Sequence, residues 1–107
     1  IGDQVLIQVS SILRENVRNV DTVARYGGEE FVILFPEITS SESYSICDRL
    51  RDLVEKAPWA TLHPELKVTL SMGICDDLSL LDSDAMIDCA DKKLYQAKQN
   101  GKNQVKF

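Results

Sequence analysis

Two adjacent carboxylates, Glu29 and Glu30, follow the glycine pair Gly27 and Gly28 in the stretch 25–31, which reads RYGGEEF. Carboxylate oxygens are hard ligands of the kind that Mg²⁺ takes, usually one or two per ion, with substrate phosphates as further ligands. Glycines without side chains let a nucleotide approach the backbone closely. These residues are therefore a candidate metal and nucleotide site, although by residue type alone acids at a Gly-Gly turn are more often a solvated hairpin tip.

The hydrophobic pattern predicts two helices in the first half of the chain. Apolar side chains recur every three to four residues over 5–18, which is typical of one face of a helix. A second stripe occupies 39–58 and opens with Thr39, followed three residues later by Glu42, the spacing of a capping box. Both segments are predicted to be amphipathic helices.

A third helix is expected over 83–101. Ser83 is predicted to cap its start, and Gly101 offers the left-handed conformation that commonly ends a helix. Lys98 and Lys102 flank its end, where cations favour the helix dipole whether or not they bind a ligand. Its predicted inner face consists of Ile87, Ala90, Leu94 and Ala97.

Four extended segments are expected beside the helices. Strands at 22–26 and 31–35 flank the glycine pair, which predicts a β-hairpin because glycine allows the positive φ of tight turns. Segments 68–75 and 104–107 add a third strand and an edge strand. Because 31–35 is apolar at every position, we expect it to be covered on both faces. The sheet of this α+β domain then lacks a member, which we expect N-terminal to Ile1.

The composition fits one soluble globular domain. The 107 residues carry 12 basic and 17 acidic side chains, a net charge of −5, and 44% are hydrophobic. The acidic balance disfavours a protein that coats nucleic acid, and the sequence contains neither a run of about 20 apolar residues nor a signal peptide. Three scattered cysteines and one loop histidine, His63, argue against a disulfide framework, a zinc site or a His-based triad. We expect reduced cysteines, a cytoplasmic location, and no contact of this domain with nucleic acid or membrane. A membrane tether in an upstream region of the parent protein is left open.

Four stretches, in order, resemble the GGDEF family of diguanylate cyclases. The stretch 25–31 is similar to the family signature in its Glu-for-Asp variant. Residues 1–6, 68–74 and 90–103, which read IGDQVL, VTLSMGI and ADKKLYQAKQNGKN, resemble the family's other motifs. The resemblance covers essentially the whole chain. It implies a ferredoxin-like palm of the nucleotidyl cyclases, with helices on a mixed, mostly antiparallel sheet whose first strand is missing.

The resemblance also implies a reaction and a set of catalytic residues. Members of the family condense two GTP into cyclic di-GMP and release two pyrophosphates, in a homodimer that depends on Mg²⁺ or Mn²⁺. Glu29 matches the metal-binding acid that helps to activate the attacking hydroxyl, and Glu30 matches the second catalytic acid. Gly27 and Gly28 match the glycines against which the nucleotide sits. Such phosphoryl transfer needs positioning and charge neutralisation more than covalent chemistry.

Three further residues match positions that bind the substrate. Lys98 and Lys102 match phosphate-binding bases, and Lys102 replaces the more usual arginine, so it keeps the charge but loses the bidentate fork. Asp3 matches an acid that reads guanine, since a carboxylate can accept from both N1–H and the exocyclic amine. Asp3 is equally natural as the N-cap of the first helix, and both roles are compatible.

Arg18 and Asp21 have the spacing of the family's inhibitory product site, in which arginine clamps phosphate or stacks on guanine and aspartate accepts from the base. Arg49, on the exposed side of the second helix, matches the secondary arginine of that site. By composition alone, a turn Asp beside a helix-end Arg, and a solvated helix arginine, are about as common. We expect inhibition by cyclic di-GMP.

Residues 1–107 are thus expected to be a partial GGDEF domain that lacks its N-terminal strand and helix region. Without the acid expected on that strand, we predict that these residues alone bind Mg²⁺-GTP poorly and do not turn over. One alternative function is a catalytically silent domain that binds cyclic di-GMP, although the intact acid pair favours an enzyme. An adenylyl-type cyclase is disfavoured by Asp3.

Overall fold

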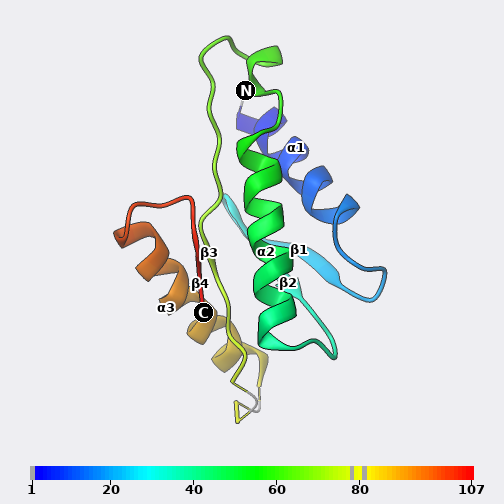
Figure 1. Ribbon diagram of the computed structural model, residues 1–107, viewed down its shortest axis with the longest axis vertical. Coiled ribbons are helices and arrows are strands. Elements are labelled where there is room, and N and C mark those ends of the chain that lie inside the picture. Colours follow the sequence, from blue (N-terminus) through cyan, green and yellow to red (C-terminus); the bar gives the residue numbers. More distant parts are fainter. Residues whose placement is uncertain (1, 78, 81) are drawn as a thin grey trace.

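The computed structural model describes residues 2–77, 79–80 and 82–107, which form an α+β fold (Figure 1). The helices and strands, in chain order, are α1 (Gly2–Glu15), β1 (Thr22–Gly27), β2 (Glu30–Leu34), α2 (Ser40–Glu55), the short 3-10 helix η1 (Trp59–Thr61), β3 (Met72–Gly73), α3 (Ser83–Gln99) and β4 (Val105–Lys106). The predicted class and the three helices are confirmed. None of the helices in the described ranges is both long and apolar enough to cross a membrane.

The ends of the helices follow local hydrogen bonding. The Thr39 hydroxyl oxygen accepts the Glu42 N–H at 3.1 Å, so the predicted start of α2 is confirmed. The cap of α3 was predicted wrongly, because the Asp82 carboxylate accepts the Ala85 N–H at 2.7 Å and Ser83 is already helical. The left-handed stop at Gly101 is confirmed by its φ of 113°.

The first helix is shifted from its predicted bounds and ends at Glu15 rather than near position 18. The side chain of Asn16 donates to the Ile12 carbonyl at 2.8 Å and so takes the place of the next helical N–H. The backbone then turns from Arg18 to Asp21, whose N–H donates to the Arg18 carbonyl at 3.0 Å. This turn leads directly into the hairpin.

The β-structure of the described residues forms two separate pairs of strands. β1 and β2 are an antiparallel hairpin, whereas β3 and β4 pair in parallel. The prediction of a strand over 68–75 was too long, because only Met72 and Gly73 join the ladder and Val68 and Leu70 instead pack on the core. The expectation that 31–35 is covered on both faces was also wrong. β2 is half-buried, and Leu34 at its end is 54% exposed.

The main core lies between α1, α2 and the hairpin, which α2 crosses in Figure 1. Its buried residues are Val9, Leu13, Leu50, Val54 and Trp59. The Trp59 indole N–H donates to the Val54 carbonyl at 2.6 Å, so its one polar atom is satisfied inside the core. All three cysteines are free, as predicted, and burial raises the pKa of the Cys47 thiol to about 12.

The second packed unit joins α3 to β3 and β4 (Figure 1). Here the backbone of Gly73 lies directly on the backbone of α3. A Cβ atom at Gly73 would overlap the Ala90 carbonyl oxygen and the Leu94 amide nitrogen, and would lie 2.9 Å from the Lys93 carbonyl carbon. Ala97, on the inner face predicted for this helix, is completely buried. Glycine is therefore required at position 73 because no side chain fits between strand and helix.

Candidate functional site

The acidic pair lies at the tip of the β1–β2 hairpin. Gly27 pairs with Glu30, so the turn residues are Gly28 and Glu29 rather than the two glycines, and the register shifts between Arg25 and Gly27. Gly28 has a φ of 47°, in the left-handed region that favours glycine. The hairpin prediction is thus confirmed, with the turn one residue later than the glycine pair alone suggested.

Arg25 holds this turn in shape. Its Nε and Nη2 both donate to the Gly28 carbonyl, at 3.0 and 2.6 Å. That carbonyl is therefore satisfied within the hairpin, and the side chains of Glu29 and Glu30 are exposed. From the sequence, Arg25 was recognised only as part of the motif and not as a residue that holds the turn. Its position three residues before the turn glycine was the available signal for this role.

The exposed tip fits a hard divalent cation by its chemistry. Glu29 and Glu30 offer carboxylate oxygens, which Mg²⁺ prefers, and Mg²⁺ is commonly bound by only one or two carboxylates together with phosphates and water. Gly27 leaves open space beside them, since a Cβ there would meet no atom within 4 Å. Across the described ranges, no group of three or more His, Cys, Asp or Glu side chains is arranged to hold a metal. Further ligands would have to come from a bound substrate, water or other residues.

The two candidate phosphate-binding lysines lie at the C-terminal end of α3. Lys98 is in its last turn, and Lys102 follows the Gly101 stop, where its N–H donates to the Ala97 carbonyl at 2.9 Å. Both side chains are exposed. No ion pair involves either of them within the described part of the chain. Both ammonium groups are thus accessible to an anionic ligand.

Asp3 lies in the first turn of α1 and is exposed. The helix begins at Gly2, so Asp3 is inside the helix and the N-cap interpretation was wrong. An acid in this turn still favours the positive end of the helix dipole. Its carboxylate also remains accessible to a ligand.

Arg18 and Asp21 bind each other closely. The Arg18 Nη2 donates to the Asp21 Oδ1 at 2.7 Å, and Nε donates to both carboxylate oxygens at 3.1 Å. The Arg18 backbone N–H also donates to the Asp21 Oδ2 at 2.8 Å. The Arg18 Nη2 donates in addition to the Pro36 carbonyl at 2.7 Å. The Asp21 side chain has no exposed surface, whereas that of Arg18 is 39% exposed. These hydrogen bonds lower the pKa of Asp21 below its ordinary value of 3.8.

We predict that Asp21→Asn destabilises the domain in a pH-dependent manner. Because the pKa of Asp21 is depressed in the folded state, its stabilisation is complete above the ordinary value of 3.8 and is lost as the pH falls through the depressed value. The wild type should therefore have the higher melting temperature at pH 6, and the difference between the two proteins should shrink as the pH falls below 3.8. Melting followed by circular dichroism at each pH checks this. A difference between the two proteins that is constant with pH would contradict it.

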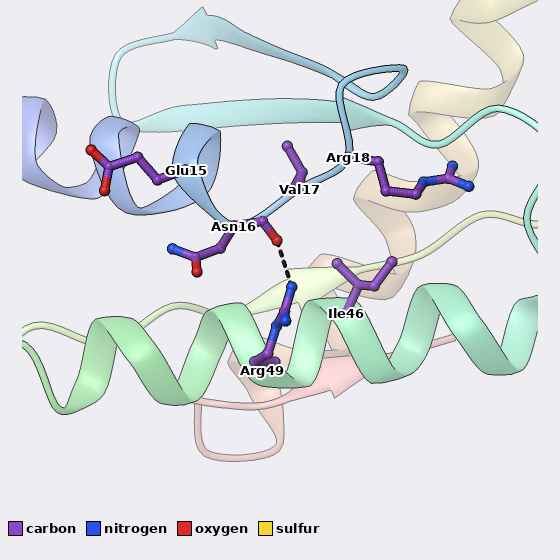
Figure 2. A pocket seen from close by; sticks show the side chains of 6 residues that line it. All are labelled: Glu15, Asn16, Val17, Arg18, Ile46 and Arg49. Carbon is purple, nitrogen blue, oxygen red and sulfur yellow. Dashed lines mark hydrogen bonds between the residues drawn. The ribbon is translucent and has the colours of Figure 1, made fainter.

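Arg49 shares a surface hollow with Arg18. The hollow has a volume of about 250 Å³, and its lining comprises Glu15, Asn16, Val17, Arg18, Ile46 and Arg49. Figure 2 shows that the Arg49 guanidinium extends from α2 toward the loop after α1, where it donates to the Asn16 carbonyl at 2.6 Å. Arg49 is exposed, as predicted. The structure thus brings the three predicted product-site residues to one region.

The other predicted residues lie on separate elements. Glu29 and Glu30 are on the hairpin tip, Lys98 and Lys102 at the end of α3, and Asp3 at the start of α1. No hydrogen bond or ion pair joins these three places in the ranges that the structure describes. Within the described residues, the predicted acids, lysines and Asp3 therefore remain three separate groups.

Comparison with known proteins gives the family. The model of the family described as diguanylate cyclase, GGDEF domain, matches residues 1–104. Diguanylate cyclase A of Treponema denticola is 37% identical over 105 residues, a match that covers 97% of this chain and 28% of that protein. Response regulator PleD of Caulobacter vibrioides is 38% identical over 108 residues, covering 98% of this chain and 24% of that protein.

A solved structure agrees. Diguanylate cyclase SiaD of Pseudomonas aeruginosa, crystallised in complex with its activator SiaC, superposes with a TM-score of 0.86 at 26% identity, over 96% of this chain and 40% of that one. The chain spans about a quarter of the length of the two curated relatives. From the family match, the identities and the shared fold together, this chain belongs to the GGDEF family of diguanylate cyclase domains.

Proposed function

We propose that this domain, in the intact protein, is a Mg²⁺-dependent diguanylate cyclase that condenses two GTP into cyclic di-GMP and two pyrophosphates. The observation that carries the proposal is the hairpin tip, where two exposed carboxylates stand beside open space at Gly27 in a chain of this family. In each half-reaction, a 3′-hydroxyl oxygen bonds to the α-phosphorus of the other GTP, and the bond to pyrophosphate breaks. Two domains facing each other would hold one GTP each.

Each candidate residue then has a role in accordance with its chemistry. Glu29 would hold the metal, with Glu30 beside it, and Mg²⁺ or Mn²⁺ would neutralise charge on the phosphates. Lys98 and Lys102 offer accessible positive charge to the triphosphate. Asp3 would accept hydrogen bonds from the guanine edge. The second acidic ligand, expected from the family resemblance to precede Ile1, would complete the metal site.

The direct test is incubation of the intact protein with GTP and Mg²⁺, followed by chromatographic detection of cyclic di-GMP. Formation of one cyclic di-GMP with two pyrophosphates supports the proposal, and ATP should neither replace GTP nor compete with it. Omission of the metal should abolish the product, and Mn²⁺ should restore it. An intact protein that binds GTP and forms no product under these conditions would contradict the enzymatic proposal.

We predict that alanine substitutions at the two tip glycines differ in their effects. Gly28→Ala should cost about 1–2 kcal/mol of unfolding free energy, because its φ of 47° disfavours any side chain. Gly27→Ala should leave stability unchanged, since its Cβ has room, yet weaken GTP binding at least about tenfold by filling the space where a nucleotide would lie against the backbone. Chemical denaturation and GTP titration of both variants test this. If Gly27→Ala binds GTP with wild-type affinity, the nucleotide does not lie against the backbone of Gly27.

The arginine-containing hollow favours a second function, the binding of cyclic di-GMP. Arg18 and Arg49 line it together, and guanidinium groups pair with phosphates and stack on guanine. Because Arg18 is already bound to Asp21, the ligand would have to compete with that pair or use the exposed part of the guanidinium. Calorimetric titration with cyclic di-GMP tests this binding, and Arg49→Ala should weaken it. A silent binding domain would show this affinity without making product.

A further inference from the structure

The turn after α3 contains two consecutive non-glycine residues in the left-handed region. Lys102 has a φ of 63° and Asn103 a φ of 48°, directly after Gly101 at 113°. Non-glycine residues rarely adopt this conformation and keep it only where surrounding contacts hold them. Lys102 is one of the two lysines to which the proposed function assigns the phosphates. The contacts that hold this turn therefore decide where its ammonium group can reach.

Asn103 makes the contacts that hold the turn. Its Oδ1 accepts from the Arg51 Nη1 at 3.0 Å, and its Nδ2 donates to the Glu55 Oε2 at 2.6 Å. Its backbone N–H donates to the Ser71 hydroxyl oxygen at 3.1 Å. The amide is thus held from both of its polar atoms by α2 and from the backbone by the segment that precedes β3. We call Arg51, Glu55 and Asn103 the amide clamp.

The clamp is itself fixed on one face of α2. Arg51 also donates from Nε to the Asp48 Oδ1 at 2.9 Å and from Nη1 to the Glu55 Oε1 at 3.4 Å. These three residues are three and four positions apart, so they lie on the same side of the helix. The Arg51 side chain is only 18% exposed. A half-buried, charge-paired guanidinium is a stiff anchor for the Asn103 amide.

Lys102 itself is held only by its backbone. Its N–H donates to the Ala97 carbonyl at 2.9 Å, and its carbonyl accepts from the Gln104 Nε2 at 3.1 Å. Its side chain is exposed and makes no ion pair within the ranges that the structure describes. The turn thus combines a fixed backbone with a side chain left available to a ligand.

We infer that Asn103 is a positioning residue, which through Arg51 and Glu55 fixes the backbone of Lys102 so that its ammonium group meets the GTP phosphates. The inference rests on the proposed function, because it assumes that Lys102 binds the triphosphate. It adds a requirement outside the residues to which the proposed function assigns the nucleotide, namely the contacts between Asn103 and α2. The loss of the clamp should act on substrate binding more than on the chemical step.

The test is Asn103→Gly in the intact protein, since glycine accepts the same φ and removes the amide that Arg51 and Glu55 hold. We expect the KM for GTP to rise about tenfold, with kcat changed less than about twofold. The matched control is Asn100→Ala, which removes an amide side chain just before the same turn. The contact that Gln104 makes with Asn100 is to its backbone carbonyl and not to its side chain, so this variant keeps it. This control should have an unchanged KM. Melting temperatures of all variants verify folding.

A double-mutant cycle separates positioning from a purely structural role. If Asn103 acts through Lys102, then in a Lys102→Ala background Asn103→Gly should change the KM less than about twofold. A full tenfold effect in that background would overturn the inference, as would a normal KM for Asn103→Gly beside a weakened Lys102→Ala. If Lys102→Ala itself binds GTP normally, the proposed role of the lysine fails and takes the inference with it.

A reversal of the hydrogen bond gives a rescue experiment. Asn103→Asp places a carboxylate against that of Glu55 and removes the donor, so the KM should rise as in Asn103→Gly. Adding Glu55→Gln restores a donor on the opposite partner, and the KM should return to within about threefold of the wild type. A double variant that remains as weak as Asn103→Asp alone would contradict the role of the Glu55 contact.

Discussion

Replacement of Gly73 with alanine is expected to destabilise the domain by about 3 kcal/mol or more. The added Cβ would overlap two backbone atoms of α3, the Ala90 carbonyl oxygen and the Leu94 amide nitrogen, and backbone cannot rotate away as a side chain can. To fit it, β3 and α3 must separate. For a domain of this size, such a loss lowers the melting temperature by roughly 12 °C or more. Thermal or urea unfolding of Gly73→Ala measures it.

The matched control for this prediction is Gly2→Ala. Gly2 is the first residue of α1, and a Cβ there would meet nothing within 4 Å. Alanine favours helices over glycine by roughly 1 kcal/mol at interior positions, so Gly2→Ala should be neutral or slightly stabilising. Equal stability of both variants would show that strand and helix do not meet as closely as described.

Glu29→Gln is expected to lower cyclic di-GMP formation by at least about 100-fold, an effect of the size seen when a single charge-stabilising group is removed from an active site. The amide keeps the shape of the side chain and loses the negative charge that would hold Mg²⁺. Stability should not change, because Glu29 is an exposed turn residue. Product formation at saturating GTP and a titration with Mg²⁺ measure the loss.

Glu65→Gln is the control for the change in net charge. Glu65 is also an exposed acid in a loop, but it lies outside the hairpin tip. This variant should have wild-type activity. If Glu29→Gln forms product as fast as Glu65→Gln, Glu29 does not hold the metal, and the proposal for the hairpin tip is wrong.

Local sequence signals predicted the elements better than they predicted the sheet. The Thr39 capping box, the Gly101 stop and the glycine hairpin were read correctly because each depends on residues within four positions. The strand over 68–75 and the covered strand over 31–35 were not, because strand pairing depends on distant partners. Val68 and Leu70 look like strand residues, yet they are apolar because they pack on the core.

The candidate site shows the same division. Its acids, glycines and lysines could be named from the motif, since chemistry is visible in residue type. What holds them could not be named. The hydrogen bond from Arg25 to the Gly28 carbonyl is short-range, but the motif does not indicate it. The hydrogen bond from Arg51 to Asn103 joins residues 52 positions apart, and no local pattern predicts such a contact. Likewise, the spacing of Arg18 and Asp21 predicted a shared site, but it did not predict that the two side chains bind each other.

The separate packing of α3 also has a consequence for how the fold opens. The main core contains side chains from α1, α2, the hairpin and the extended segment before β3, whereas α3 rests on β3 and β4. Detachment of α3 would therefore cost less free energy than global unfolding and could occur as a sub-global fluctuation. Because Lys98 lies in the last turn of this helix, a triphosphate bound to it as proposed would suppress that fluctuation first, whereas the turn that carries Lys102 would stay tied to α2 through Asn103.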